Sequence, residues 1–130
     1  MLRPGGRFVG AVWSGPAEAD IVRFQQTAGG FAPTPPVQGV GPGALADPSE
    51  FLSQLRAAGL NPKCEKVTTT FEFANFQDAW DALAGVTTAT LEPKVQEEAK
   101  AAVRALMWPD AGAPRTFCNS TQLIYARKAS

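Results

Sequence analysis

The chain has 130 residues, and its 12 basic and 12 acidic side chains give a formal net charge of zero. This length predicts a single domain over residues 1–130, and the balanced charge lacks the basic excess typical of nucleic-acid-binding and membrane-surface proteins. No histidine is present, which excludes Ser-His-Asp and Cys-His catalytic sites and histidine-ligated metals. We expect a cytoplasmic protein that binds no metal, no nucleic acid and no membrane.

The amino-terminal segment predicts a buried strand. Turn residues at positions 4–6 precede an almost continuous apolar run over residues 8–13. Such a run is typical of a strand that is covered on both faces. Pro16 then falls in the first turn of a helix expected over residues 16–28. A loop rich in proline and glycine is expected over residues 31–46.

The next helix has clear signals at both ends. Asp47 is the expected N-cap, Pro48 the expected first helical residue, and apolar residues follow at helical spacing. Gly59 stands where a left-handed residue closes a helix. The sequence therefore predicts a helix over residues 47–58.

Two further strands are expected. Residues 63–73 alternate between apolar and polar, which indicates a strand with one solvent-exposed face. Residues 115–127 carry apolar side chains on both faces, which favours a position at the centre of the sheet.

Two helices are expected between these strands. Asn75 is the expected N-cap of a short helix that ends at Gly85, and a threonine-rich linker follows. A longer helix is expected from Pro93 to about Trp108. Its expected apolar stripe consists of Leu91, Val95, Ala99, Val103 and Leu106.

The two cysteines, Cys64 and Cys118, are too few for a disulfide framework and too far apart for a Cys-x-x-Cys site. We expect both to be buried free thiols. A single disulfide bridge between them is the alternative.

Three motifs follow one another along the chain. They are Leu-Arg-Pro-Gly-Gly-Arg-Phe at 2–8, Asp-Pro-x-Glu-x-Leu at 47–52 with Ala-Gly-Leu at 58–60, and Gln-Leu-Ile-Tyr-Ala-Arg-Lys at 122–128. In this order they resemble the carboxyl-terminal half of class I S-adenosylmethionine-dependent methyltransferases of the type 11-like group. The first is similar to the turn that leads into the family's fifth strand, the second to the helix before its sixth strand, and the third to its seventh strand.

The resemblance implies an α/β fold, α+β as an isolated chain, that forms part of a Rossmann-like methyltransferase fold. Its three-stranded mixed sheet would have the order first-third-second, with the last strand central and antiparallel and with helices on both faces. Residues 74–114 would be a helical insertion that resembles a cap on the substrate side. The chain would then be a truncated or split methyltransferase-like domain that supplies the acceptor-substrate side.

The cofactor-binding motifs of that family are absent from the sequence. In the family, a glycine-rich turn and an acidic residue in the amino-terminal half hold the cofactor. Residues 39–43 contain a Gly-x-Gly, but it follows no predicted strand, and Pro42 lacks the backbone N–H that such a loop uses. We therefore expect no S-adenosylmethionine binding and no methylation by this chain alone, with the cofactor implied only for a complete enzyme. No catalytic or cofactor-binding residue is assigned.

The aromatic residues suggest a pocket for an apolar or aromatic acceptor. The candidate lining residues are Trp13, Phe31, Trp80, Met107 and Trp108. The competing interpretation is that aromatic residues at helical spacing are core, and for Phe76, Trp80 and Leu83 it is the favoured one. For Trp13 and Trp108, which lie at element ends, both interpretations stay open.

The first strand of the resembled fold would lack its neighbour on one side. An open, uncharged edge favours pairing with another chain, and the expected edge residues are Phe8, Val9 and Val12. We expect a homodimer, or a complex with a separate amino-terminal methyltransferase half. The alternative functions are an oligomeric module that binds a small apolar ligand and a non-catalytic scaffold.

Overall fold

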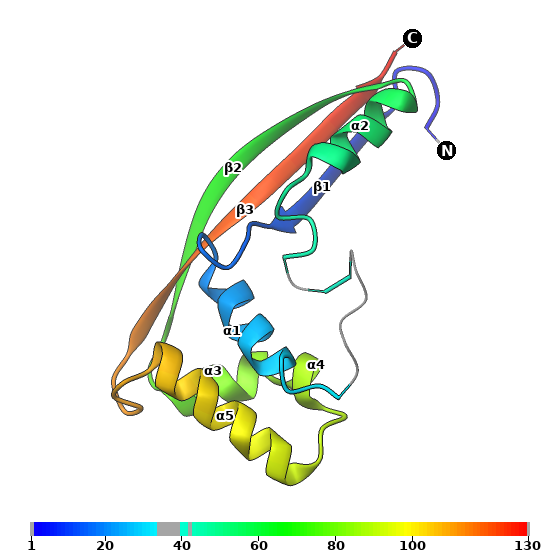
Figure 1. Cartoon of the computed structure of the whole chain (residues 1–130). Helices are drawn as coiled ribbons and strands as arrows, with labels where there is room; N and C mark the ends of the chain where they lie inside the picture. Colours follow the sequence, from blue (N-terminus) through cyan, green and yellow to red (C-terminus); the bar gives the residue numbers. More distant parts are fainter. Residues whose placement is uncertain (1, 34–39, 42, 130) are drawn as a thin grey trace.

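The computed structural model describes residues 2–33, 40, 41 and 43–129 (Figure 1). These residues form three strands, β1 (Arg7–Trp13), β2 (Leu60–Phe73) and β3 (Arg115–Lys128). The helices are α1 (Asp20–Gly29), α2 (Ser49–Ala57), α3 (Phe76–Leu83), α4 (Gly85–Thr88) and α5 (Pro93–Met107). Of the loop predicted over residues 31–46, including its Gly-x-Gly stretch, residues 34–39 and 42 lie outside the described residues.

The strands form one sheet in the order β1-β3-β2, and β3 pairs antiparallel with both neighbours. β3 pairs with the whole of β2, from Arg115 opposite Phe73 to Lys128 opposite Leu60. β1 pairs only with the second half of β3, from Trp13 opposite Thr121 to Arg7 opposite Arg127. The predicted strand order and the central, antiparallel last strand are confirmed, but both strand pairs are antiparallel, so the sheet is not mixed.

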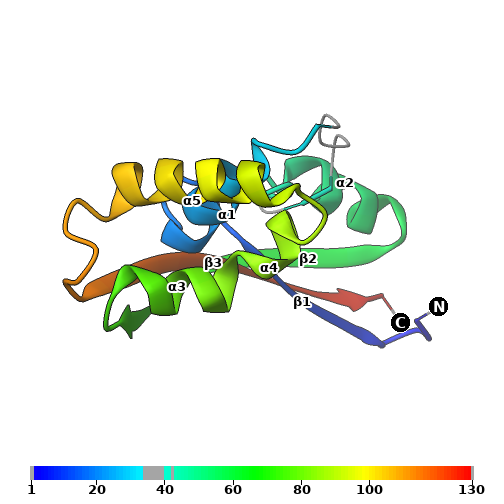
Figure 2. The same cartoon turned by 90° about the horizontal axis from the view of Figure 1, so that it is seen from below.

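The buried side chains of β3 change face halfway along the strand. Phe117 and Asn119 point to one face, whereas the buried residues from Ser120 onward, such as Gln122 and Ile124, point to the other. α1, α3 and α5 pack at the Phe117 end, and α2 packs at the opposite end, over β1 and β2 (Figures 1 and 2). Helices therefore cover both faces of the sheet, as predicted, but each face at only one end.

The larger core lies where α1, α3 and α5 meet the first half of β3. Phe24, Trp108 and Phe117 are buried there, with ring centroids 6.2 Å apart between Phe24 and Phe117 and 5.8 Å apart between Trp108 and Phe117. Trp108 Nε1 donates a hydrogen bond of 2.8 Å to the Ala113 carbonyl, so its polar atom is satisfied within the core. A smaller contact, between Phe8 and Phe51 at 5.9 Å, joins β1 to α2.

The first strand is covered on one face only. Phe8 packs against α2, but Val9 is 75% exposed on the other face, so the expected burial on both faces is wrong. The helix after it begins at Asp20, later than residue 16, because the residues before it bond to β3. The Glu18 carbonyl accepts the Ser120 N–H, and Ala19 forms a bridge with Asn119.

The end of α2 and the start of α3 follow the predicted signals, but α2 begins one residue later than predicted, with Pro48 as its N-cap and Ser49 as its first residue. Asp47 Oδ1 accepts the Ser49 N–H at 3.0 Å, and this hydrogen bond lowers the pKa of Asp47 below its usual value. Gly59 has φ of 84°, the left-handed conformation expected of a helix-closing glycine. Asn75 Oδ1 caps α3 by accepting the Asp78 N–H at 2.9 Å.

Three other expectations are corrected. The threonine-rich linker contains the short helix α4. The backbone N–H groups of Thr87 and Thr88 and the Thr88 hydroxyl all donate hydrogen bonds to the Ala84 carbonyl at its start. β2 begins at Leu60, because its first residues pair with the end of β3. Cys64 and Cys118 are free, as expected, but they are exposed and not buried.

Within the described residues, no helix has the length and apolar character needed to cross a bilayer.

The apolar stripe of α5 is displaced at its end. Met107 is 1% exposed, whereas Leu106, which the predicted stripe contained, is 46% exposed. Met107→Ala should therefore lower the free energy of unfolding by about 2–5 kcal/mol, because it opens a cavity beside Trp108. Leu106→Ala, the matched control, should cost less than about 1 kcal/mol. Urea denaturation followed by circular dichroism measures both, and equal losses would contradict this packing.

Candidate functional site

Three residues of the expected aromatic pocket lie in the core. Met107 and Trp108 are buried, and Trp80 packs between Phe24 and Phe76 at centroid distances of 6.1 and 6.2 Å. Their neighbours are other apolar side chains of the helical end of the molecule. For Trp80 and Trp108 the structure therefore favours the core interpretation.

Trp13 and Phe31 lie elsewhere. Trp13 lines a cavity of about 440 Å³ between the end of β1 and residues 40, 41 and 43–45. Phe31 is half-buried after the end of α1 and is not among the residues that line this cavity. The five aromatic and apolar side chains are thus not brought together in one cavity by the described residues.

A cavity of about 710 Å³ opens between α3 and α5, within the predicted cap. Its lining is mixed, with the polar and charged Gln77, Glu97, Lys100 and Arg104 beside the apolar Phe76 and Ala101. Lys100 Nζ donates a hydrogen bond of 2.7 Å to Gln77 Oε1 across it. This lining differs from the apolar one expected of an acceptor pocket in residues 74–114.

An apolar groove lies on the uncovered face of the sheet, at the end away from α1, α3 and α5. It has a volume of about 620 Å³, and β1, β2 and β3 all contribute to it. Val9, Leu123 and Tyr125 form its floor, and Tyr125 is 41% exposed. The register explains the cluster, because Val9 is directly opposite Tyr125 and both point to the same face.

Basic side chains border this groove. Arg7, Lys63 and Arg127 line it, one from each strand. Among the described residues none of the three has a carboxylate partner within ion-pair distance. Glu65, opposite Leu123, is the acidic residue on the same face of β2, so the groove carries a local basic excess in a chain with no net charge. Sequence reasoning missed this site, although the two-faced apolar pattern of β3 required something to cover Leu123 and Tyr125.

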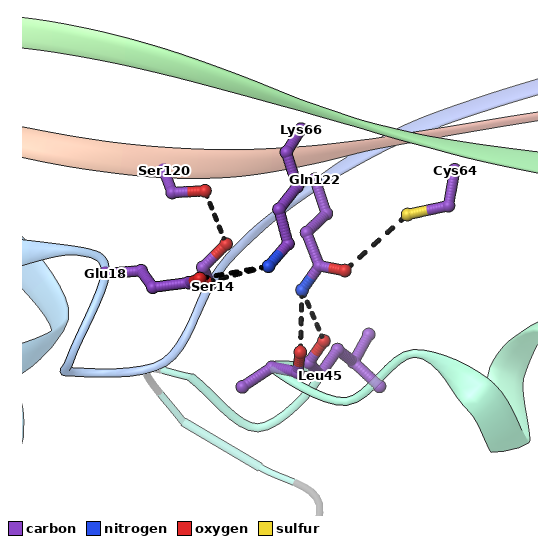
Figure 3. A network of polar contacts seen from close by, with 8 residues as sticks. Ser14, Glu18, Leu45, Cys64, Lys66, Ser120 and Gln122 are labelled. Atoms are coloured by element: carbon purple, nitrogen blue, oxygen red, sulfur yellow. Dashed lines mark hydrogen bonds and ion pairs between the residues drawn. The ribbon is translucent and has the colours of Figure 1, made fainter.

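A polar network secures the loop before α2 to the opposite face (Figure 3). Gln122 is buried, and its Nε2 donates to the Ala46 carbonyl at 2.8 Å and to the Leu45 carbonyl at 3.4 Å. Its Oε1 accepts from Cys64 Sγ at 3.5 Å. Beside it, Ser14 Oγ donates to Ser120 Oγ at 2.8 Å.

The same network holds the segment after β1 in place. Lys66 Nζ lies 2.9 Å from a carboxylate oxygen of Glu18, which joins β2 to this segment (Figure 3). Asp20 Oδ2 accepts the Cys118 N–H at 2.9 Å, and its other oxygen lies 3.9 Å from Arg115. Both carboxylates that follow β1 are therefore already bonded within the chain.

Comparison with solved structures finds a similar fold within a larger protein. The chain is similar to the YcgJ protein of Bacillus subtilis, with a TM-score of 0.51 and 16% identity over 99% of this chain and 53% of that one. It is also similar to BH2331 of Bacillus halodurans C-125, a candidate methyltransferase, with a TM-score of 0.49 and 18% identity over 99% of this chain and 54% of that one. No protein-family model matches the sequence, and no curated protein matches it.

The chain spans about half the length of these solved structures. At such identities the likeness concerns the fold alone. The chain therefore has an α+β fold that corresponds to about half of a larger one.

The loop attachment through Gln122 can be tested directly. Gln122→Leu keeps the size of the side chain but removes the donor to two carbonyls, so it should lower the free energy of unfolding by about 1–3 kcal/mol. It should also speed hydrogen exchange at the amides of Ala44 and Ala46. Gln54→Leu, on the exposed side of α2, should change stability by less than about 0.5 kcal/mol. Unchanged exchange in the Gln122 variant would show that other contacts hold the loop.

Proposed function

We propose that this chain is the acceptor-substrate side of a class I, type 11-like methyltransferase fold, and that alone it neither binds S-adenosylmethionine nor transfers a methyl group. Two observations support the proposal. Nearly the whole chain superposes on half of a larger solved structure. Its three strands also have the order and directions that its sequence motifs imply for the family's last three strands.

The residues at the end of β1 do not fit a resident S-adenosylmethionine. Such a cofactor needs free backbone amides at a glycine-rich turn and a free carboxylate for the ribose. Here the amides of Ser14, Glu18 and Ala19 donate within the chain, and so the turn has few donors left. Glu18 pairs with Lys66, and Asp20 accepts from the backbone of β3.

The chain has one strand edge without a partner and an uncovered groove beside it. The outer edge of β1 and the groove next to it are the surfaces that a completing half would cover, and the groove is apolar enough to require cover. In this proposal the protein acts in the cytoplasm, and methyl transfer depends on a second polypeptide segment that brings the cofactor.

Calorimetric titration tests the cofactor part of the proposal. The isolated chain should give no binding heat with S-adenosylmethionine up to about 1 mM. An intact class I methyltransferase in the same buffer is the control. A micromolar Kd for the isolated chain would contradict the proposal.

The DNA directly upstream tests the half-fold part. It should encode a glycine-rich strand–turn–helix, and its product, mixed with or joined to this chain, should bind S-adenosylmethionine and change the chemical shifts of β1 and of the groove residues. A product that binds the cofactor but leaves β1 and the groove unchanged would contradict the assignment of this chain as the other half.

The groove favours a second candidate function, a module that binds a small apolar ligand with an anionic end. Its volume of about 620 Å³ lies in the usual range for small-molecule sites. Its apolar floor suits an aliphatic or aromatic body, and Arg7, Lys63 and Arg127 at its border suit a carboxylate.

Dodecanoate is a suitable probe for this second function. It should bind more tightly than the neutral dodecanol, and Arg127→Gln should weaken dodecanoate binding about tenfold while leaving dodecanol unchanged. Arg56→Gln, on the exposed side of α2, is the matched control. Equal affinities for the acid and the alcohol would exclude a role for the basic border.

A further inference from the structure

We propose that in the isolated chain the outer edge of β1 pairs antiparallel with β1 of a second copy, in a register centred on Gly10. This inference depends on the free edge of β1 and not on the proposed relation to methyltransferases. It goes beyond that proposal because it names an occupant for the edge and fixes which residues face one another.

The hydrogen bonds at the two ends of β1 show which backbone groups are free. The Gly6 carbonyl accepts from Lys128, and the Ser14 N–H donates to Ser120, in the same register that joins β1 to β3. In an antiparallel pair, bonded residues alternate. The even-numbered residues of β1 thus bond to β3, and the odd-numbered ones point their N–H and C=O groups outward.

The outward-pointing residues are Arg7, Val9, Ala11 and Trp13. Among the described residues, no backbone hydrogen bond joins them to another segment. The strand also has none of the features that guard natural edges, because Arg7 is its one charged residue and it has no lysine, proline or bulge.

The spacing of these four residues selects one register. They lie symmetrically about Gly10, so antiparallel pairing centred there places each outward residue opposite another. Every outward N–H and C=O of both strands then has a partner. A shift by one residue sets outward residues against inward ones, and a shift by two leaves end residues without a partner.

The side chains agree with this register. Arg7 lies opposite Trp13 of the partner subunit, on one face, where a guanidinium can stack on the indole. Phe8 lies opposite Val12 of the partner subunit, on the other face, which is a favourable aromatic and β-branched pair. Val9 lies opposite Ala11 of the partner subunit. The two Arg7 side chains fall at opposite ends, so no like charges meet.

There is space for this partner at the end of β1. A cavity of about 440 Å³ separates Ala11, Val12 and Trp13 from residues 40, 41 and 43–45. The described part of this loop therefore leaves open space beside the end of β1. Face-to-face pairing of the two grooves is disfavoured because their basic borders repel each other.

Disulfide trapping tests the register. In a Cys64→Ser and Cys118→Ser background, Val9→Cys with Ala11→Cys places thiols opposite each other across the dimer. Directly opposite residues have Cα atoms about 5.5 Å apart, within disulfide range. This variant should form a covalent dimer at least about tenfold faster than Val86→Cys, an exposed collision control. The single variants Val9→Cys and Ala11→Cys should stay at the control rate.

Sedimentation velocity provides a second, independent measurement. The wild-type chain and Val9→Thr should dimerise with a micromolar Kd, because one strand pair makes a small interface. Val9→Pro removes an outward N–H that β3 does not use, so it should be monomeric with an unchanged circular dichroism spectrum.

Three results would overturn the proposal: a monomeric wild-type chain at all concentrations, an undiminished Val9→Pro dimer, or single-cysteine variants that cross-link as fast as the double variant. None of these results depends on S-adenosylmethionine binding. Failure of the dimer and failure of the proposed methyltransferase relation can therefore be told apart.

Discussion

The pairing of β3 with a strand on each side is the constraint on which the rest of the structure depends. At the end of β3, Lys128 pairs with Leu60 of β2, and its N–H donates to the Gly6 carbonyl just before β1, so β3 holds both other strands. Its buried side chains change face at Asn119 and Ser120. One strand thus contributes to the helical core at one end and to a smaller layer under α2 at the other. Each face of the sheet is therefore covered at one end and uncovered at the other.

That arrangement explains why the candidate surfaces lie where they do. Phe24, Trp80 and Trp108 pack in the core around Phe117, so these three are not available to line an acceptor pocket. The groove and the free edge of β1 lie at the opposite end, where β1 and β3 present Val9 and Tyr125 without a covering helix. An apolar, basic-bordered face next to a strand with one unpaired edge is what half of a larger α/β fold would expose.

The sequence predicted correctly those features that depend on a residue's own backbone and near neighbours in the chain. Asn75 and Gly59 specify helix ends through their own side chain or backbone, and the two-faced apolar pattern of β3 specifies its central place. It was uninformative where the outcome depends on distant segments. Whether Val9 is buried depends on a covering layer that periodicity cannot reveal, and whether Trp108 lines a pocket or the core depends on how α5 meets Phe117.

The open edge of β1 is most directly tested by amide hydrogen exchange in a dilute, monomeric sample. The amides of Phe8, Gly10 and Val12, which face β3, should exchange slowly, and those of Val9 and Ala11 should exchange nearly as fast as in an unfolded peptide. Uniform protection along β1 would show that another segment covers this edge, and it would contradict the account of an incomplete sheet.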